Sequence, residues 1–155
     1  MAPLKSILLD TSAYSHFARA GHYGLLEQIF QGRLYVVSLV QDEAGRGTKK
    51  FPELGALAAS IAAGKTRMID ELTDKEFEVM TSLPRKFSDT DRVCITVAEE
   101  RGMILATDDE DLLQEAQKRG IATSETEDIL EEAARIIGPK RAKEVLADIV
   151  KSGAD

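Results

Sequence analysis

The segment Phe87–Leu113, FSDTDRVCITVAEERGMILATDDEDLL, constrains this chain more than any other. It reads as an acidic helix start with Asp89 and Asp91, an apolar strand, and a second acidic helix start with Asp108 and Asp109. Because the two acidic starts lie on either side of one strand, we expect folding to bring them to one region. The pattern therefore raises the question of what chemistry a group of carboxylates performs there.

The rest of the chain alternates between strand and helix patterns. Short apolar runs predict strands at Leu4–Leu9, Leu34–Val37, Arg67–Asp70, Met103–Ala106 and Ile121–Ala122. Helical spacing and capping signals predict helices at Ala13–Gly21 (after the capping types Thr11 and Ser12), Tyr23–Phe30, Ser38 onward through Glu43, Phe51–Gly64, Thr73–Ser82, Ser88 onward, Asp109–Arg119, Thr126–Ile137 and Pro139–Lys151. The basic stretch Gly45–Lys50 is predicted to be a flexible loop. This alternation predicts an α/β domain with a mainly parallel sheet and helices on both faces.

Length and composition place the chain among soluble globular proteins. Its 155 residues predict one domain, 1–155, with residues 138–155 as a C-terminal helical extension. The single cysteine, Cys94, excludes a disulfide framework or a cysteine-based zinc site within one chain, and two histidines argue against a His-rich site. The N-terminal apolar run is too short for a signal peptide or a membrane span, so we expect a cytoplasmic protein without membrane contact.

The charge is acidic and unevenly distributed. Residues 1–50 carry 6 Lys and Arg against 4 Asp and Glu, a balance of +2, whereas the remainder carries 14 against 23, a balance of −9. The sum is the formal net charge of −7. A simple nucleic-acid binder usually presents a net basic surface. Any contact with nucleic acid must therefore be local, or must use bound cations to offset the carboxylates.

Each acid taken alone has an ordinary structural explanation. Ser88-x-x-Asp91 has the spacing of a capping box, and Asp109 in TDDED suits the first turn of a helix. Asp10 directly follows a predicted strand in the sequence DTS, which is also a common turn. Ligands of parallel sheets bind beyond the carboxyl ends of the strands, and Asp10 and the Asp108–Asp109 pair both follow such ends.

The acids are more informative as a group. Carboxylates that converge at one sheet edge repel one another unless protons or cations neutralise them. With few Cys and His, oxygen donors favour Mg²⁺ or Mn²⁺ over zinc. Two such ions about 3.5–4 Å apart can activate water and stabilise the leaving oxygen of a phosphodiester. The sequence has no GxxxxGK[ST] phosphate loop and no GxSxG nucleophile motif, and Asp10-Thr11-Ser12 lacks the second Asp of the DxD motif of haloacid-dehalogenase-like phosphatases.

Four segments, ILLDTSAYSHFARAG, VVSLVQDE, FSDTDRVCITVAEERGMILATDDEDLL and GIATSETEDILEEA, together resemble the PIN-domain family, from about Leu4 to Glu132. That family comprises metal-dependent ribonucleases, including VapC-type toxins of toxin–antitoxin pairs. The resemblance implies a three-layer α/β/α fold with a parallel, roughly five-stranded sheet. It also implies hydrolysis of RNA by activated water, leaving 5′-phosphate and 3′-hydroxyl ends.

The resemblance also assigns the site. The family's metal-binding and catalytic acids fall on Asp10, Glu43, Asp91 and Asp109, and hydroxyls near the metal on Thr11 and Thr107. We assign Asp10, Glu43 and Asp91 to a principal Mg²⁺ or Mn²⁺, and Asp109 to a second metal or to the positioning of water. Asp42 competes with Glu43 for the place in the second segment. Basic residues that would hold RNA phosphates, although each alone is explained as a surface cation, are Arg46, Lys49, Lys50, Arg85, Lys86 and Arg92.

The sequence thus predicts an RNA-cleaving enzyme that depends on Mg²⁺ or Mn²⁺, with the toxin of a toxin–antitoxin pair as one form of this function. The alternative is a catalytically silent PIN-like module that binds RNA or a protein partner. Expected partners are RNA, an antitoxin protein and a second copy of the chain in a homodimer. The apolar stretches Gly21–Phe30 and Leu54–Ala63 are candidate contact surfaces, although their default interpretation is as core-facing helices.

Overall fold

A five-stranded, fully parallel sheet forms the centre of the molecule in the computed structural model, which describes residues 4–153. Its strands are β1 (Ile7–Leu9), β2 (Leu34–Val37), β3 (Arg67–Ile69), β4 (Ile104–Ala106) and β5 (Thr123–Ser124). Their order is β3-β2-β1-β4-β5, so the chain moves outward from β1 in one direction and then resumes on its other side with β4. The boundary between β1 and β4 is the switch point at which parallel sheets bind ligands.

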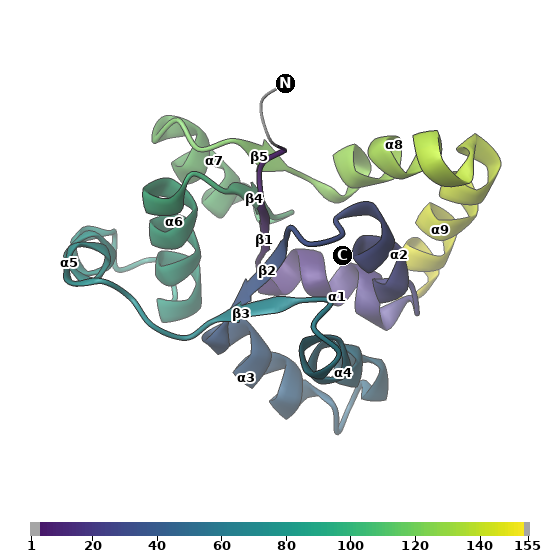
Figure 1. Ribbon diagram of the computed structural model, residues 1–155, viewed down its shortest axis with the longest axis horizontal. Coiled ribbons are helices and arrows are strands. Elements are labelled where there is room, and N and C mark those ends of the chain that lie inside the picture. Colours follow the sequence, from purple (N-terminus) through teal and green to yellow (C-terminus); the bar gives the residue numbers. More distant parts are fainter. Residues whose placement is uncertain (1–3, 154–155) are drawn as a thin grey trace.

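Helices cover both faces of this sheet (Figure 1). They are α1 (Thr11–Arg19), α2 (Tyr23–Ile29), α3 (Ser38–Gly47), the 3₁₀ helix η1 (Pro52–Gly55), α4 (Ala56–Ala62), α5 (Asp74–Ser82), α6 (Asp89–Arg101), α7 (Glu110–Lys118), α8 (Thr126–Ile137) and α9 (Pro139–Lys151). In Figure 1, α5, α6 and α7 lie to the left of the sheet and α1, α2, α8 and α9 to the right, with α3 and α4 below. The predicted three-layer α/β/α architecture is confirmed.

Burial on both faces stabilises these short strands. All residues of β1 are buried, as expected for a strand covered on both faces, and Leu8 pairs with Tyr35 on one side and Leu105 on the other. The apolar faces of the helices join the same core. Val145 and Ile149 extend it into α9, so the described part of the predicted 138–155 extension packs on the domain; residues 154 and 155 lie outside the described residues.

Several predicted boundaries shift, each for a local reason. The final strand is Thr123–Ser124 rather than Ile121–Ala122, because the Ile121 N–H still bonds the carbonyl of Ala116 at the end of α7 (3.0 Å). The first strand begins at Ile7 rather than Leu4, where pairing with β2 and β4 starts.

The prediction of a flexible loop from Gly45 onward is wrong at its start, because α3 runs on to Gly47. A Cβ at Gly47 would lie 2.6 Å from a methyl carbon of Leu54, so the absence of a side chain lets η1 pack against the end of α3. The predicted helix Phe51–Gly64 accordingly starts as η1 and continues as α4. Ser38 is the first residue of α3 rather than its cap, because β2 runs directly into the helix.

The candidate contact stretches prove to be core-facing. Tyr23, Leu26 and Ile29 of α2 and Leu57 of α4 are buried. Among residues 4–153, none of the helices is both long and apolar enough to cross a bilayer.

Tyr14 attaches the η1–α4 segment to α1. Its buried hydroxyl donates to the carbonyl of Leu54 (2.5 Å) and accepts from the N–H of Leu57 (3.0 Å). We expect Tyr14→Phe to lower the free energy of unfolding by about 1–3 kcal/mol, because both backbone groups lose their partner in a buried place. Urea denaturation of the variant measures this. Tyr35→Phe, on a partly exposed side chain, is the matched control and is expected to change stability by less than about 0.5 kcal/mol.

Candidate active site

Asp10 stands at the end of β1, beside the switch point. Its side chain is 3 % exposed, and its carboxylate accepts hydrogen bonds from the N–H of Ala13 (2.8 Å) and the hydroxyls of Ser12 (2.8 Å) and Thr107 (2.5 Å). Asp10 is therefore the N-cap of α1, a place that the sequence favoured for Thr11 or Ser12. Three donors, two from α1 and one from the loop after β4, therefore fix the carboxylate in position.

Thr107 connects Asp10 to Asp109. The Thr107 side chain, which is fully buried, donates to Asp10 and accepts the N–H of Asp109 (3.1 Å). Asp109 caps α7 by accepting the N–H of Leu112 (3.0 Å), and it remains exposed. The capping explanation of Asp109 is thus correct for one oxygen. It does not exclude a second role, because the residue lies beside β4 at the edge where β1 ends.

Glu43 enters the same region from α3. Its two carboxylate oxygens accept from the hydroxyls of Thr11 and Thr90 (2.9 Å for Thr90), which lie on α1 and α6. Glu43 is half-buried, whereas its neighbour Asp42 is exposed. Since α3 continues past Gly45, the helix presents Glu43 and not Asp42 to the other acids.

Asp91 comes from the first turn of α6. The hydroxyl of Ser88 caps that helix by accepting the N–H of Asp91 (3.1 Å), as the capping-box spacing predicts. Asp91 is half-buried, and Asp89 points into solvent and pairs with Arg92. The cap and the proximity to the other acids therefore coexist at Asp91.

Burial and neighbouring charges raise the pKa of two of these acids and of one nearby thiol. Burial raises the pKa of Asp91, and the negative charges of Asp109 and Glu43 raise it further. Burial likewise raises the pKa of Asp10 to about 6, against the lowering effect of its hydrogen bonds. The thiol of Cys94 lies fully buried beneath them, and its pKa rises through burial and through the charges of Asp10, Asp91 and Glu43. The structure thus brings together four carboxylates that the sequence places far apart.

Two hydroxyls at this site escape the sequence reasoning. Ser12 holds Asp10, and Thr90 holds Glu43. Each directly neighbours a predicted residue, which was the only signal available. Nothing in the sequence pairs Thr90 with Glu43, 47 positions earlier.

Asp108, by contrast, has a structural role. Its carboxylate accepts the N–H of Thr126 at the start of α8 (2.8 Å) and the Thr126 hydroxyl, and it lies 2.6 Å from Nδ1 of His16 on α1. Burial opposes its ionisation, yet these contacts hold the pKa of Asp108 below its usual value. The N–H of Asp108 donates to the hydroxyl of Ser12 (3.2 Å). The hydroxyl that donates to Asp10 therefore also binds the loop after β4.

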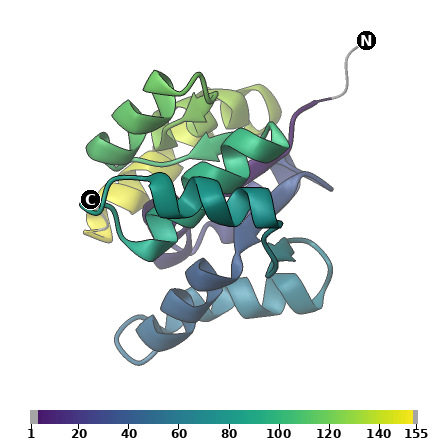
Figure 2. The same cartoon turned by 90° about the vertical axis from the view of Figure 1, so that its left-hand side faces the viewer.

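The predicted phosphate-binding cations lie on two segments. Arg46, Lys49 and Lys50 belong to the end of α3 and the turn after it, and Arg85 and Lys86 to the turn before α6; all five are exposed. Both segments lie toward the left of the molecule in Figure 2. None of the five forms an ion pair within residues 4–153. Arg92 differs, since it is bound to Asp89.

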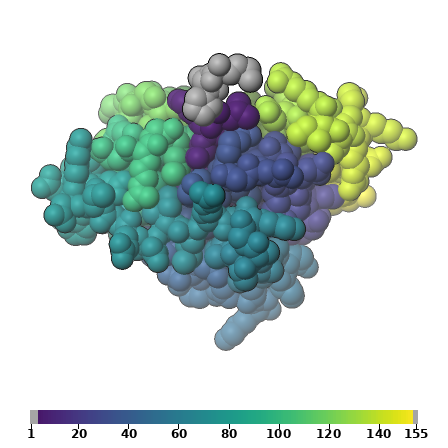
Figure 3. Space-filling view, in the orientation of Figure 1, coloured from purple at the N-terminus to yellow at the C-terminus, as the bar shows by residue number. Residues whose placement is uncertain are grey.

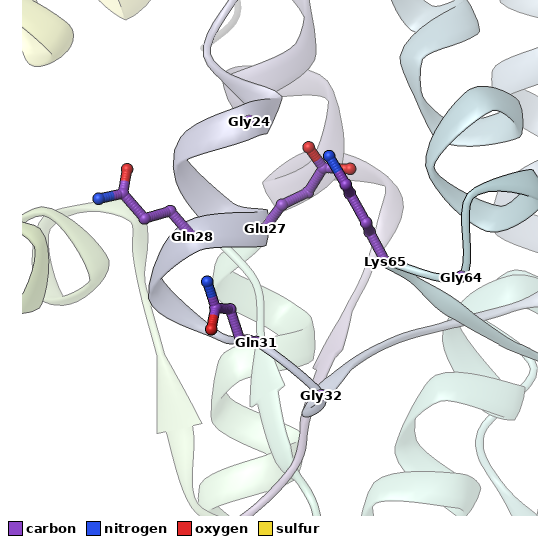
Figure 4. Close-up of a pocket in the computed structure, with 7 residues that line it drawn as sticks. All are labelled: Gly24, Glu27, Gln28, Gln31, Gly32, Gly64 and Lys65. Atoms are coloured by element: carbon purple, nitrogen blue, oxygen red, sulfur yellow. The ribbon is translucent and has the colours of Figure 1, made fainter.

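A surface hollow of about 390 Å³ lies elsewhere, along α2 and the turns that precede β2 and β3 (Figure 4). Its polar lining includes Glu27, Gln31 and Lys65. These turns lead into the amino ends of the strands, so the hollow is at the opposite edge of the sheet from the four acids.

Comparison with known proteins identifies the fold and the family. A family model described as a PIN domain (DUF3368) matches residues 6–154. The chain belongs to the PIN-domain family. The crystal structure of PAE2754 from Pyrobaculum aerophilum superposes with a TM-score of 0.61 over 84% of this chain and 98% of that one, at 22% sequence identity, which supports the fold. No curated protein sequence matches the chain significantly.

Members of the PIN-domain family are generally nucleases and typically use divalent metals. The donors at this site fit such an ion: they are carboxylate oxygens whose mutual repulsion a cation would relieve. The donor atoms are thus of the right chemical type, but their arrangement is not that of a complete metal site. Within residues 4–153, no three His, Cys, Asp or Glu side chains are arranged closely enough to hold an ion together. Glu43 and Asp10 are instead engaged by hydroxyls.

The raised pKa of Asp10 predicts a pH dependence for the metal-free protein. A carboxyl whose pKa rises from 3.8 to about 6 on folding binds its proton more tightly when folded, so its contribution to stability falls as pH rises through that window. We expect Asp10→Asn to be more stable than wild type above about pH 6, by on the order of 2–3 kcal/mol, with the difference vanishing near pH 4. Urea denaturation in EDTA across this pH range measures it. A variant less stable than wild type at every pH would contradict this account.

Asp108 should behave in the opposite way. Asp108→Asn removes a charge that accepts hydrogen bonds from the start of α8, so we expect a loss of about 1–3 kcal/mol at pH 7. The loss should shrink at low pH, where wild-type Asp108 is itself protonated. Thermal and urea unfolding give the comparison. Asp111→Asn, on an exposed acid of the first turn of α7, is the matched control and should be nearly neutral.

Proposed function

We propose that this protein is a Mg²⁺- or Mn²⁺-dependent endoribonuclease that hydrolyses RNA phosphodiester bonds. The observation that supports the proposal is the presence of Asp10, Glu43, Asp91 and Asp109 near the switch point of a PIN-domain sheet, where the charges of Glu43 and Asp109 raise the pKa of Asp91. Such a site gains most from a ligand that is positively charged and binds oxygen. A phosphodiester, with its own negative charge, can approach these acids only if cations lie between.

The proposed metal-binding roles come from the family resemblance, and the proposed roles of the hydroxyls come from their contacts. Asp10, Glu43 and Asp91 would hold the principal ion and Asp109 a second ion or the attacking water. Bound metal would supply an activated water and stabilise the charge on the phosphate and the leaving oxygen. Thr107 orients Asp10 and Asp109 relative to each other, and Thr11 and Thr90 orient Glu43. These hydroxyls hold the acids in place.

Substrate approach would depend on local cations, since the chain as a whole is acidic. The proposed contacts for RNA phosphates are the five exposed cations that form no ion pair among residues 4–153: Arg46, Lys49, Lys50, Arg85 and Lys86. Arg92 would join them only by leaving Asp89. We further propose a cytoplasmic location, in keeping with a buried free Cys94. An action as a toxin with a cognate antitoxin is a separate part of the proposal, and an adjacent short open reading frame in the genome would support it.

The proposal predicts selective loss of activity in matched variants. Asp10→Asn and Asp91→Asn should lower the rate of RNA cleavage with Mn²⁺ by at least about 100-fold, because each removes a proposed metal ligand. Glu43→Gln should also lose activity. The neighbours Asp89→Asn and Asp42→Asn lie on the same two helices but are exposed, and they should keep activity within about threefold. Gel electrophoresis of end-labelled RNA, with EDTA as a further control, gives these rates.

A catalytically silent module that binds RNA or a protein is the second candidate. It is favoured by one observation, that no three metal-binding side chains are arranged around a common point within the described residues. Calorimetry separates the two functions. Heat of Mn²⁺ binding that Asp10→Asn abolishes supports the enzyme, whereas RNA binding without metal binding or cleavage supports the module.

A further inference from the structure

Two adjoining hollows lie on the surface between α2 and α4, apart from the four acids. The first is the hollow of about 390 Å³ in Figure 4, and the second has a volume of about 340 Å³. Both are lined by Gly24, Glu27 and Lys65, so the hollows meet at these three residues. The wall of the second hollow includes alanines of α4, among them Ala59. In Figure 3 the dark blue α2 and the teal α4 adjoin on the face turned toward the viewer.

A chain of buried hydroxyls holds Glu27 in place. The Ser60 hydroxyl donates to Oε2 of Glu27 (2.6 Å), and it lies 2.6 Å from the hydroxyl of Thr66. The Thr66 hydroxyl in turn lies 2.7 Å from that of Tyr23. Because each hydroxyl has only one proton, Thr66 donates to Ser60 and Tyr23 donates to Thr66. All three of these side chains are buried, so the Glu27 carboxylate is the fixed end of a directed chain of hydrogen bonds.

The other carboxylate oxygen of Glu27 is open to the hollows. Gly24 lies one turn earlier in α2, and even a Cβ added there would lie 3.8 Å from Oε1 of Glu27. Figure 4 shows the Lys65 side chain, from the turn after α4, projecting toward the same space. Neither Glu27 nor Lys65 forms an ion pair within residues 4–153. Among the described residues that line the hollows, these two alone carry a charge.

We propose that this Glu27–Lys65 site binds a free α-amino acid whose side chain is uncharged. The ammonium group of the ligand donates to Oε1 of Glu27, and the carboxylate of the ligand accepts from Nζ of Lys65. A metal ion or a simple amine pairs with Glu27 but is repelled by Lys65, and a simple anion meets the reverse situation. A zwitterion is the ligand whose two charges both find a partner.

The lining also restricts the side chain of the ligand. A third charge would have no partner, because only Glu27 and Lys65 are charged among the described lining residues. An uncharged side chain has two places, since Gln28 and Gln31 border the first hollow and alanines border the second. We therefore expect neutral amino acids to bind more tightly than acidic or basic ones.

The site is independent of the proposed RNA cleavage, since it shares no residue with the four acids. The volumes of the two hollows fall in the range of about 300–1,000 Å³ that small-molecule sites occupy. A neutral amino acid has about 5–15 non-hydrogen atoms, so we expect a Kd of about 10 µM to 1 mM.

Calorimetric titration of the full chain at pH 7 with the free standard amino acids tests the site. At least one neutral amino acid should bind with a stoichiometry of one per chain. Its N-acetyl derivative and its carboxyl amide should each bind at least about tenfold more weakly, because each keeps one charge and lacks the other. These derivatives distinguish a zwitterion site from a site for an amine, a metal ion or an anion.

Matched variants of the chain locate the binding. Glu27→Gln and Lys65→Gln should each weaken binding of that amino acid by at least about tenfold. Glu27→Gln keeps an oxygen that accepts from Ser60, so the fold should be retained, which an unchanged melting temperature would show. The exposed controls Glu53→Gln and Lys118→Gln remove the same charges elsewhere and should alter binding by less than about twofold.

Gly24→Leu provides a second arm, because it fills the space where the hollows meet and leaves both charges. Binding should be lost, while the melting temperature of the free chain should not fall, since Leu is a better helix former than Gly. Three outcomes would each overturn the proposal: no standard amino acid binds with a Kd below about 10 mM, the tightest ligand is acidic or basic, or binding survives both Glu27→Gln and Gly24→Leu. RNA cleavage is measured separately, so its presence or absence leaves this result unchanged.

Discussion

The hydrogen bond from Thr107 to Asp10 joins the two halves of this fold. It links the ends of β1 and β4 across the switch point, and both side chains are almost completely buried. Burying a carboxylate is costly unless it is hydrogen-bonded, and here three different donors hold it. The cost is still visible, because the pKa of Asp10 stays raised to about 6. This cost is consistent with the metal-binding role proposed for Asp10, beside its structural role as the cap of α1.

The other elements extend this link outward. The Thr107 hydroxyl also accepts the N–H of Asp109, and the Ser12 hydroxyl accepts the N–H of Asp108. The carboxylate of Asp108 in turn accepts the N–H of Thr126 at the start of α8. Glu43 is connected to α1 and α6 through hydroxyls. A chain of short polar contacts therefore runs from the proposed site to the α8–α9 hairpin.

Position within each helix explains which acids face one another. Asp89 and Asp91 are two residues apart in α6, about 200° around the helix, so one faces solvent when the other faces the sheet edge. Asp42 and Glu43 differ by 100°, which is enough to expose one and half-bury the other. Which acid of each pair faces the site depends only on the orientation of a single helix. The assignments were made from the resemblance in the sequence and agree with the burial of the side chains.

Much of the fold follows from local sequence. Periodicity and caps locate β2, α8 and α9 at their observed bounds, and the run of strands and helices determines the parallel three-layer architecture. Predictions fail where a distant contact decides a local feature. The length of α3 depends on Leu54 packing against Gly47, and the position of β5 depends on the Ala116 carbonyl.

The sequence by itself determined which residue types are present and at which element ends they stand: carboxylates after strands and at helix starts. Only the tertiary structure decided what each one contacts. In the folded chain Asp10 caps α1, and Glu43 accepts a hydrogen bond from Thr90. Asp108 contacts the start of α8 and His16. The physical reason is that capping, spacing and burial patterns are local along the chain. The hydrogen bonds that distinguish a structural acid from a candidate ligand cross between elements, and the bond from Thr107 to Asp10 joins residues 97 positions apart.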